Sequence, residues 1–206
     1  MTNLLNDQLK ITKISDNITI VDNILKDYIV NFLRLRIQIQ NRFDTFYEDY
    51  QAIDYFLNSD SLTKDLSYEI KNKFKLNNFN RAWSLVYNEK SNGVFYHQDF
   101  DSKTTVNIWV TPDECIKDVS KNGLYIWDQC PPDWQKMYSD YKIGCRHRCI
   151  DEFVKENEKS IIKIDYKCNR AIFFPGNFLH ETVGVETVDG FLNRRVSYTM
   201  LFGGNQ

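Results

Sequence analysis

Two histidines and one aspartate carry the clearest chemical signal in this sequence of 206 residues. His97 and Asp99 are separated by a single residue within the stretch 95–99. Residues two apart on a β-strand face the same side, so this imidazole and this carboxylate are expected to point at one object. The pair suits a divalent ion such as Fe(II), and His180, which follows a bulky apolar stretch with a turn, is the candidate third ligand. Two histidines and one carboxylate form a facial triad that leaves coordination positions open.

A second signal lies in residues 194–202, which are expected to form the last strand. Its alternation separates an apolar face from a polar one, and the polar face carries Arg195 and Ser197. An arginine and a serine on one face near a metal suit a bidentate grip on a carboxylate. Arg194 is the competitor, because a β-bulge would exchange the two arginines between the faces.

Near residue 81 the spacing of apolar residues changes from one typical of helices to one typical of strands. An amphipathic helix, in one piece or two, is expected from about Asn23 to Tyr50, and a second helix from about Leu62 to Phe74. Seven or eight short strands follow, and a further short strand is expected at residues 17–21. Glu89 to Gly93 are expected to form a turn. The pattern predicts a mainly β fold with N-terminal helices (α+β), in which the strands roll into a jelly roll, the cupin-like double-stranded β-helix barrel.

The length favours one domain spanning residues 1–206. Within it, residues 1–79 are expected to form a helical part that packs on the barrel, and residues 80–206 the barrel itself. An insertion at about 131–160 interrupts the barrel sequence and has helical character around 150–154. Residues 133–160 are either a lid over the site or an ordinary surface insertion.

Composition excludes several classes of function. A net charge of -2 gives no general attraction to nucleic acid or to an anionic membrane surface. No apolar run approaches the roughly 18 residues of a membrane span, and the N-terminus lacks the features of a secretory signal, so a cytoplasmic location is expected. The five cysteines are then expected to be reduced thiols. Cys145, His147 and Cys149 have zinc-ligand chemistry, but their one-residue spacing is too tight for a usual zinc clip, and a surface segment is the alternative.

The order His97-x-Asp99, His180, Arg195-x-Ser197 resembles that of the Fe(II)/2-oxoglutarate-dependent dioxygenases. The resemblance covers about residues 81–206, and the chain is similar to the phytanoyl- and prolyl-hydroxylase-like members and to bacterial proteins on the same barrel. The stretches around the triad that carry the likeness are 106–114, 122–127 and 174–176. It implies a double-stranded β-helix that uses Fe(II), 2-oxoglutarate and dioxygen. The implied reaction is hydroxylation of an unactivated C–H bond with release of succinate and carbon dioxide.

The resemblance also implies a role for individual residues. His97, Asp99 and His180 would hold Fe(II), Arg195 would bind the distal carboxylate of 2-oxoglutarate, and Ser197 would add a hydrogen bond. Prolyl-hydroxylase-like members use a lysine about ten residues after the second histidine for this carboxylate, and that position is Gly190 in this chain. Two further residues resemble co-substrate contacts of the family, although structural roles are the alternative for both: Tyr87 and Asn107.

Two other classes of function remain open at this point. One is a cupin-like metal-dependent isomerase or small-molecule binding protein on the same barrel. The other is a barrel without chemistry that binds a partner protein through its tryptophans. If the protein is an oxygenase, its substrate is expected to be a small molecule or a peptide. Neither the identity of the substrate nor the oligomeric state follows from the sequence.

Overall fold

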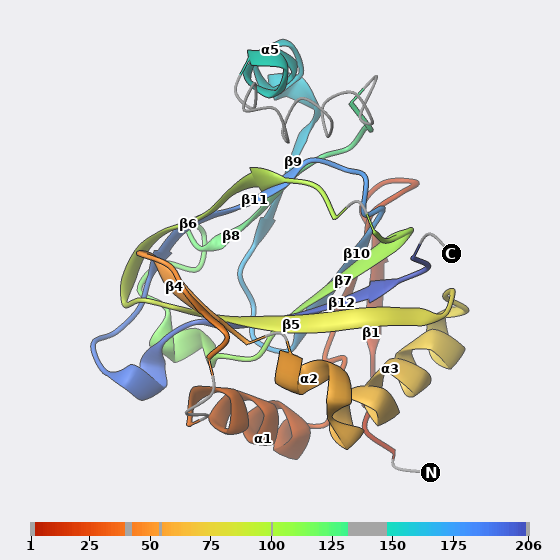
Figure 1. The fold of residues 1–206 in the computed structure, drawn as a ribbon, viewed down its shortest axis with the longest axis vertical. Coiled ribbons are helices and arrows are strands. Elements are labelled where there is room, and N and C mark those ends of the chain that lie inside the picture. Colours follow the sequence, from red (N-terminus) through yellow and green to blue (C-terminus); the bar gives the residue numbers. More distant parts are fainter. Residues whose placement is uncertain (1–2, 40–42, 54, 100, 132–147, 205–206) are drawn as a thin grey trace.

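The computed structural model describes residues 3–39, 43–53, 55–99, 101–131 and 148–204, and these form two β-sheets packed face to face (Figure 1). The larger sheet has the strand order β1-β2-β10-β7-β12-β5-β4-β3 and the smaller sheet β6-β11-β8-β9. The strands of the larger sheet are β1 (Lys10–Lys13), β2 (Thr19–Asp22), β3 (Thr45–Phe46), β4 (Tyr50–Ile53), β5 (Phe79–Tyr87), β7 (Thr104–Trp109), β10 (Arg170–Phe174) and β12 (Val196–Phe202). The strands of the smaller sheet are β6 (Lys90–His97), β8 (Gly123–Trp127), β9 (Ile161–Asp165) and β11 (His180–Glu186).

The eight strands from β5 to β12 have the connectivity of a double-stranded β-helix. The order β5-β12-β7-β10 in the larger sheet faces the order β6-β11-β8-β9 in the smaller one, and every pairing is antiparallel. The chain therefore crosses between the sheets as it winds, which is the jelly-roll arrangement. The fold class predicted from the strand spacing is confirmed.

Three helices, α1 (Asp27–Gln38), α2 (Tyr55–Ser59) and α3 (Ser61–Phe74), lie beneath the larger sheet, where the long strand β5 crosses the view in Figure 1. Asp60 caps α3 by accepting a hydrogen bond from the Thr63 backbone N–H, and Lys75 ends the helix in a left-handed conformation. The apolar faces of α1 and α3 share one core with the outer face of the sheet. That core includes the following residues: Leu33, Ile37, Leu66, Ile70, Val106, Ile108, Val196, Tyr198, Met200 and Phe202.

The helix predicted from Asn23 to Tyr50 is wrong over its second half. The helix α1 ends at Gln38, and β3 and β4 occupy the region around Phe46 and Tyr50. The strand β4 pairs with β5, and so provides backbone partners at an edge of the core sheet. Phe46 and Tyr47 are exposed, so their three- and four-residue spacing does not mark a buried helix face.

The turn predicted at Glu89 to Gly93 is also wrong in extent, because β6 already begins at Lys90. Gly93 lies inside this strand opposite Val183, with φ of 87°. A Cβ atom at this position would lie 1.9 Å from the carbonyl oxygen of Thr182. The glycine therefore permits a close approach of two strands rather than a reversal of the chain.

Residues 133–160, expected to be either a lid or a surface insertion, are described only from residue 148 onward. The helix α5 (Arg148–Glu156) lies at the end of the molecule opposite α1 and α3 (Figure 1). Phe153 packs there against Trp127 and Leu179. Residues 132–147 and the side chain of Cys149 lie outside the described part, so the zinc interpretation of Cys145, His147 and Cys149 stays a prediction.

The larger sheet extends into the N-terminal part of the chain, because β1 to β4 join it. Residues 1–79 therefore hold four strands besides the helices, and β2 lies at the short strand expected at residues 17–21. The single-domain division with boundaries near 79 and 131–160 stays a prediction. Among the described helices, none combines the length and the apolar composition needed to cross a membrane.

Candidate metal centre

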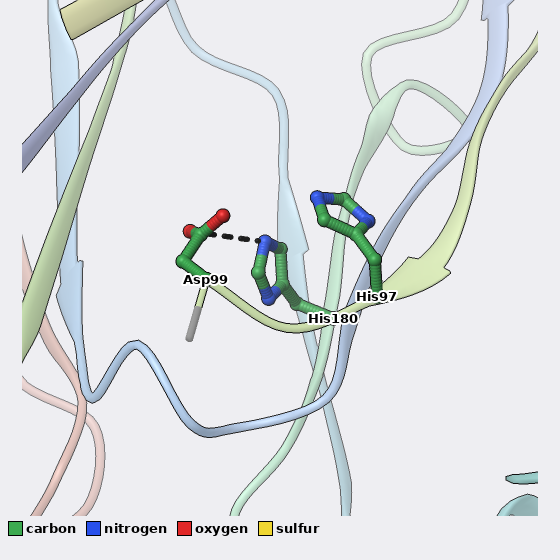
Figure 2. A group of neighbouring side chains, drawn as sticks. All are labelled: His97, Asp99 and His180. Atoms are coloured by element: carbon green, nitrogen blue, oxygen red, sulfur yellow. Dashed lines mark ion pairs between the residues drawn. The ribbon is translucent and has the colours of Figure 1, made fainter. Parts of the chain in front are cut away.

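The structure brings His97, Asp99 and His180 together between the two sheets (Figure 2). One ligand atom from each residue lies within 4.8 Å of the other two. Nε2 of His180 lies 3.6 Å from Oδ2 of Asp99, and the ring centres of the two imidazoles are 4.2 Å apart. Asp99 and His180 are buried, whereas His97 is partly exposed, so the solvent-accessible side of this cluster is that of His97.

The strand pairing fixes the two histidines next to each other. His97 is the last residue of β6 and His180 the first of β11, and the two are direct partners in the ladder. Nδ1 of His97 lies 2.8 Å from the carbonyl oxygen of Phe95, and Nδ1 of His180 lies 3.0 Å from that of Phe178. Since a carbonyl only accepts, each Nδ1 carries the proton and each Nε2 keeps its lone pair for a metal.

Asp99 lies just beyond the end of β6, in a loop held from two sides. Its backbone N–H donates to the carbonyl oxygen of Gly176 at 2.7 Å. Its Oδ2 accepts a hydrogen bond from Oγ1 of Thr105, also at 2.7 Å. These loop contacts, rather than the strand alternation from which the pairing of His97 and Asp99 was predicted, bring the carboxylate to the histidines.

Burial sets the protonation of His180. Burial and, to a smaller extent, the nearby His97 lower the pKa of His180, Asp99 and the Phe178 carbonyl raise it, and together they bring this pKa to about 4. The ring is thus neutral at ordinary pH. Its 3.6 Å approach to Asp99 is the contact of a neutral ligand with a carboxylate rather than of two full charges.

A row of polar side chains leads away from the triad along the inner face of the larger sheet. Thr105, Asn107 and Trp109 alternate inward along β7, since Val106 and Ile108 belong to the core on the helix side. On the neighbouring strand, Thr199 pairs with Asn107 and Ser197 with Trp109. Arg195 lies just before Val196, the first residue of β12, at the far end of this row from the triad.

Arg195 is a fully buried cation with no hydrogen-bond acceptor among the described residues. All three guanidinium nitrogens are unpaired. The group lies among aromatic rings: its Cζ is 5.3 Å from the ring centre of Tyr87 and 5.0 Å from those of Trp109 and Tyr166. Burial lowers the pKa of Arg195. An arginine nonetheless stays charged in a protein, and an unpaired buried charge lowers the stability of the fold by several kcal/mol. An anionic ligand bound beside Arg195 would pair with this charge.

Arg194 has different surroundings. Its Nε lies 3.5 Å from a carboxylate oxygen of Glu89, and its guanidinium lies 5.3 Å from the ring of Phe191. Its side chain retains some exposure to solvent. The two arginines, both of which precede β12, therefore differ in surroundings: Arg195 lies among rings between the sheets, and Arg194 pairs with Glu89.

The three other predicted co-substrate residues lie close to this row. Oγ of Ser197 is buried without a partner, and so is Oδ1 of Asn107, whose Nδ2 donates to Oγ1 of Thr199 at 3.0 Å. Tyr87 is buried and donates from Oη to Thr182 of the smaller sheet at 3.3 Å, so it spans the space between the sheets. The unpaired atoms of Ser197 and Asn107 offer a donor and an acceptor beside the unpaired arginine.

Sequence reasoning missed three residues that frame this site: Thr105, Thr111 and Tyr166. The alternation along β7 places Thr105 on the same face as Asn107, which was a usable signal. Thr111 and Tyr166 lie just beyond β7 and β9, and no motif links positions that far apart in the chain.

Many solved structures share the fold of this chain. HygX from Streptomyces hygroscopicus, solved with nickel and 2-oxoglutarate bound, superposes with a TM-score of 0.61 at 6% identity over 89% of this chain and 81% of that one. A Pseudomonas putida prolyl-4-hydroxylase superposes with a TM-score of 0.57 at 11% identity, over 92% of this chain and 94% of that one. This chain has the fold of the 2-oxoglutarate-dependent oxygenases.

The same oxygenase fold occurs in SnoN from nogalamycin biosynthesis, described as a non-heme α-ketoglutarate-dependent epimerase. It superposes with a TM-score of 0.61 at 10% identity over 91% of this chain and 79% of that one. No family model matches the sequence, and no curated protein matches it. At identities this low the likeness shows the fold alone, so the chemistry has to be argued from this chain's own residues.

Proposed function

We propose that the protein is an Fe(II)- and 2-oxoglutarate-dependent oxygenase that hydroxylates an unactivated C–H bond of a small-molecule or peptide substrate. The observation that carries the proposal is Arg195, a fully buried guanidinium without an acceptor, on the same inner face that leads to the triad. A metal chelator with a second, distal carboxylate satisfies both ends of this arrangement. 2-Oxoglutarate is such a compound, and it is the molecule bound in HygX.

The donor set fits the metal. His97 and His180 each direct an unprotonated Nε2 into the site, and Asp99 adds a carboxylate oxygen. Two histidines and one carboxylate on one side of an ion are the ligand set of non-heme Fe(II) oxygenases, which leaves positions for co-substrate and dioxygen. Bound Fe(II) would couple oxidative decarboxylation of 2-oxoglutarate to succinate and carbon dioxide with transfer of one oxygen atom to a substrate C–H bond.

The chain's own residues would bind and orient the co-substrate. Arg195 would hold the distal carboxylate with its N–H groups, and Ser197 would donate from its unpaired Oγ. Asn107 lies between them and the triad, where the second N–H of its Nδ2, beside the one that it donates to Thr199, would donate to the other end of the molecule. Tyr87, Trp109 and Tyr166 keep water away from the guanidinium, which strengthens its attraction for the carboxylate.

The alternative of a cupin-like isomerase or small-molecule binding protein needs no buried arginine. Such a protein would use the triad alone, and a guanidinium at this depth would be a cost without a purpose. The arrangement of Arg195, Ser197 and Asn107 therefore favours the oxygenase. Hydroxylation is our choice among the outcomes that this fold supports, since SnoN, on the same fold, is described as an epimerase.

A binding measurement tests the proposal before any substrate is known. Anaerobic addition of Fe(II) and 2-oxoglutarate to the wild-type protein should give a weak visible charge-transfer band. Succinate in place of 2-oxoglutarate should give none, because it lacks the keto group that chelates the metal. The His97→Ala variant should lose the band while keeping its far-UV circular dichroism spectrum.

A folded wild-type protein that shows no band with Fe(II) and 2-oxoglutarate would contradict the proposal. If the band forms, aerobic screening of substrate pools for succinate release identifies the substrate class. Retention of function by Arg195→Ala, with no succinate under any condition, would support the cupin-like alternative instead.

A further inference from the structure

The side chain of Thr111 forms hydrogen bonds with the backbone on both sides of Arg195. Its Oγ1 donates a hydrogen bond to the carbonyl oxygen of Arg194 at 3.0 Å and accepts one from the N–H of Val196 at 2.8 Å. The strand β7 has ended two residues earlier, at Trp109, so this side chain continues the attachment to β12 where regular pairing stops. Thr111 is fully buried, and no water competes for its hydroxyl.

The hydroxyl of Tyr166 in turn forms hydrogen bonds with the backbone of Thr111. Its Oη donates to the carbonyl oxygen of Thr111 at 2.6 Å and accepts from the N–H of Thr111 at 3.1 Å. Burial raises the pKa of Tyr166, so the hydroxyl keeps the proton that it donates. The same residue therefore fixes the main chain of Thr111, whose side chain fixes the main chain around Arg195.

The Tyr166 ring also forms part of the wall beside the guanidinium. It stacks on Trp109, with ring centres 5.0 Å apart and an interplanar angle of 18°, and Cζ of Arg195 lies 5.0 Å from each ring. The arginine is thus held by its backbone and by aromatic rings, without a neighbouring acid. A carboxylate partner from the protein would compete with a ligand for the N–H groups, whereas rings leave them free.

We infer that Thr111 and Tyr166 are positioning residues for anion binding, which hold Arg195 so that its guanidinium meets the distal carboxylate of the co-substrate. This inference rests on the proposed function, because it takes 2-oxoglutarate as the ligand. Neither residue needs to touch the ligand. Their effect should appear only for ligands that carry the distal carboxylate.

The test compares two keto acids on Mn(II)-loaded protein by isothermal titration calorimetry. 2-Oxoglutarate has the distal carboxylate, and 2-oxovalerate has the same chain length without it. Tyr166→Phe removes the hydroxyl and keeps the ring, Thr111→Val removes the hydroxyl at similar size, and Thr111→Ser keeps it. The control is Tyr198→Phe: Tyr198 is a buried tyrosine whose hydroxyl bonds Thr63 at 2.6 Å on the helix side of the same sheet.

Tyr166→Phe and Thr111→Val should each weaken 2-oxoglutarate binding by about fivefold to tenfold, the loss expected for a net hydrogen bond. Binding of 2-oxovalerate and of Mn(II) should not change. Thr111→Ser should bind like the wild type, and Tyr198→Phe should lower the melting temperature without changing the ratio of the two affinities.

The two ways of failing are distinguishable. If the wild type does not prefer 2-oxoglutarate over 2-oxovalerate, or if Arg195→Met keeps that preference, the proposed function is wrong and this inference with it. If the preference exists and depends on Arg195, but Tyr166→Phe and Thr111→Val keep the wild-type ratio, the inference alone is overturned. An equal loss for both keto acids overturns it as well, because that is the result of a purely structural role.

Discussion

Thr105 donates a hydrogen bond from Oγ1 to Oδ2 of Asp99 at 2.7 Å, and both side chains are buried. Ser102 extends this contact, because its Oγ lies 3.2 Å from Oγ1 of Thr105 and donates to the carbonyl oxygen of Asp99 at 3.3 Å. One carboxylate oxygen of Asp99 is therefore held in place by the protein. The same oxygen lies 3.6 Å from Nε2 of His180, so the contact fixes the carboxylate within the triad.

Replacing Thr105 by valine should weaken metal binding by about tenfold or more, the usual effect of losing a hydrogen bond to a ligating carboxylate. The dissociation constant of Mn(II) or Co(II), measured by calorimetry, checks this. Thr105→Ser keeps the hydroxyl and should bind the metal within about twofold of the wild type. Equal affinity of the valine and serine variants would show that the contact does not orient Asp99.

Arg195→Met should have opposite effects on binding and on stability. Binding of 2-oxoglutarate should fall by more than about thirtyfold, because the carboxylate loses its charged partner. The ligand-free protein should become more stable by about 1–3 kcal/mol, since an unpaired buried cation is replaced by an apolar side chain of similar length. Calorimetry and urea unfolding of the same preparation measure the two effects.

The control for this variant is Arg194→Met, in which the lost contacts are a 3.5 Å pair with Glu89 and a ring contact at the protein surface. It should leave co-substrate binding unchanged and alter stability by about 0.5 kcal/mol or less. Loss of 2-oxoglutarate binding in this variant, with binding retained in Arg195→Met, would exchange the roles of the two arginines.

Gly176→Ala should weaken metal binding although Gly176 is not one of the three metal-ligand candidates. A Cβ atom at this position would lie 2.1 Å from Oγ of Ser102 and 2.6 Å from the carbonyl oxygen of Asp99. The loop that carries Asp99 would have to move away, so both the melting temperature and the metal affinity should fall. Titration with Co(II) checks the affinity. A variant that binds metal like the wild type would mean that the loop moves without displacing the carboxylate.

The sequence was most informative where side-chain alternation is strict. The period of two in residues 195–200 separates Arg195 and Ser197 from Tyr198 and Met200, and the structure places the second pair in the core between the helices and the larger sheet. Alternation failed between Gln38 and Tyr50, where apolar spacing alone does not distinguish an amphipathic helix from edge strands with exposed rings.

The contacts that frame the site were not predictable in this way. Thr111 meets Tyr166 through its main chain, and Thr105 meets Asp99 across a loop. Such contacts depend on where strands end and how loops fold back, and no local propensity encodes that information. The jelly roll was predictable because seven or eight short strands at this spacing favour it over a parallel sheet, whereas the positioning residues required coordinates.

The stability of the metal-free protein should depend on pH through His180. Burial lowers the pKa of His180 to about 4, against an ordinary value of about 6.5 in an unfolded chain. Between these values the unfolded state binds a proton that the folded state does not, so the free energy of unfolding should fall as the pH drops from 6.5 to 4. The contribution of His180 is complete above pH 6.5, is lost as the pH falls through this range, and amounts to about 3 kcal/mol at most.

Urea unfolding of metal-free protein across pH 4 to 7 measures this contribution. His180→Gln removes the titrating ring and keeps a polar side chain of similar size, so its stability should change less steeply over this range than that of the wild type. Parallel curves for the two proteins would show that His180 takes up its proton equally in both states. Its ring would then be open to water, and the buried, neutral ligand on which the metal centre depends would not exist.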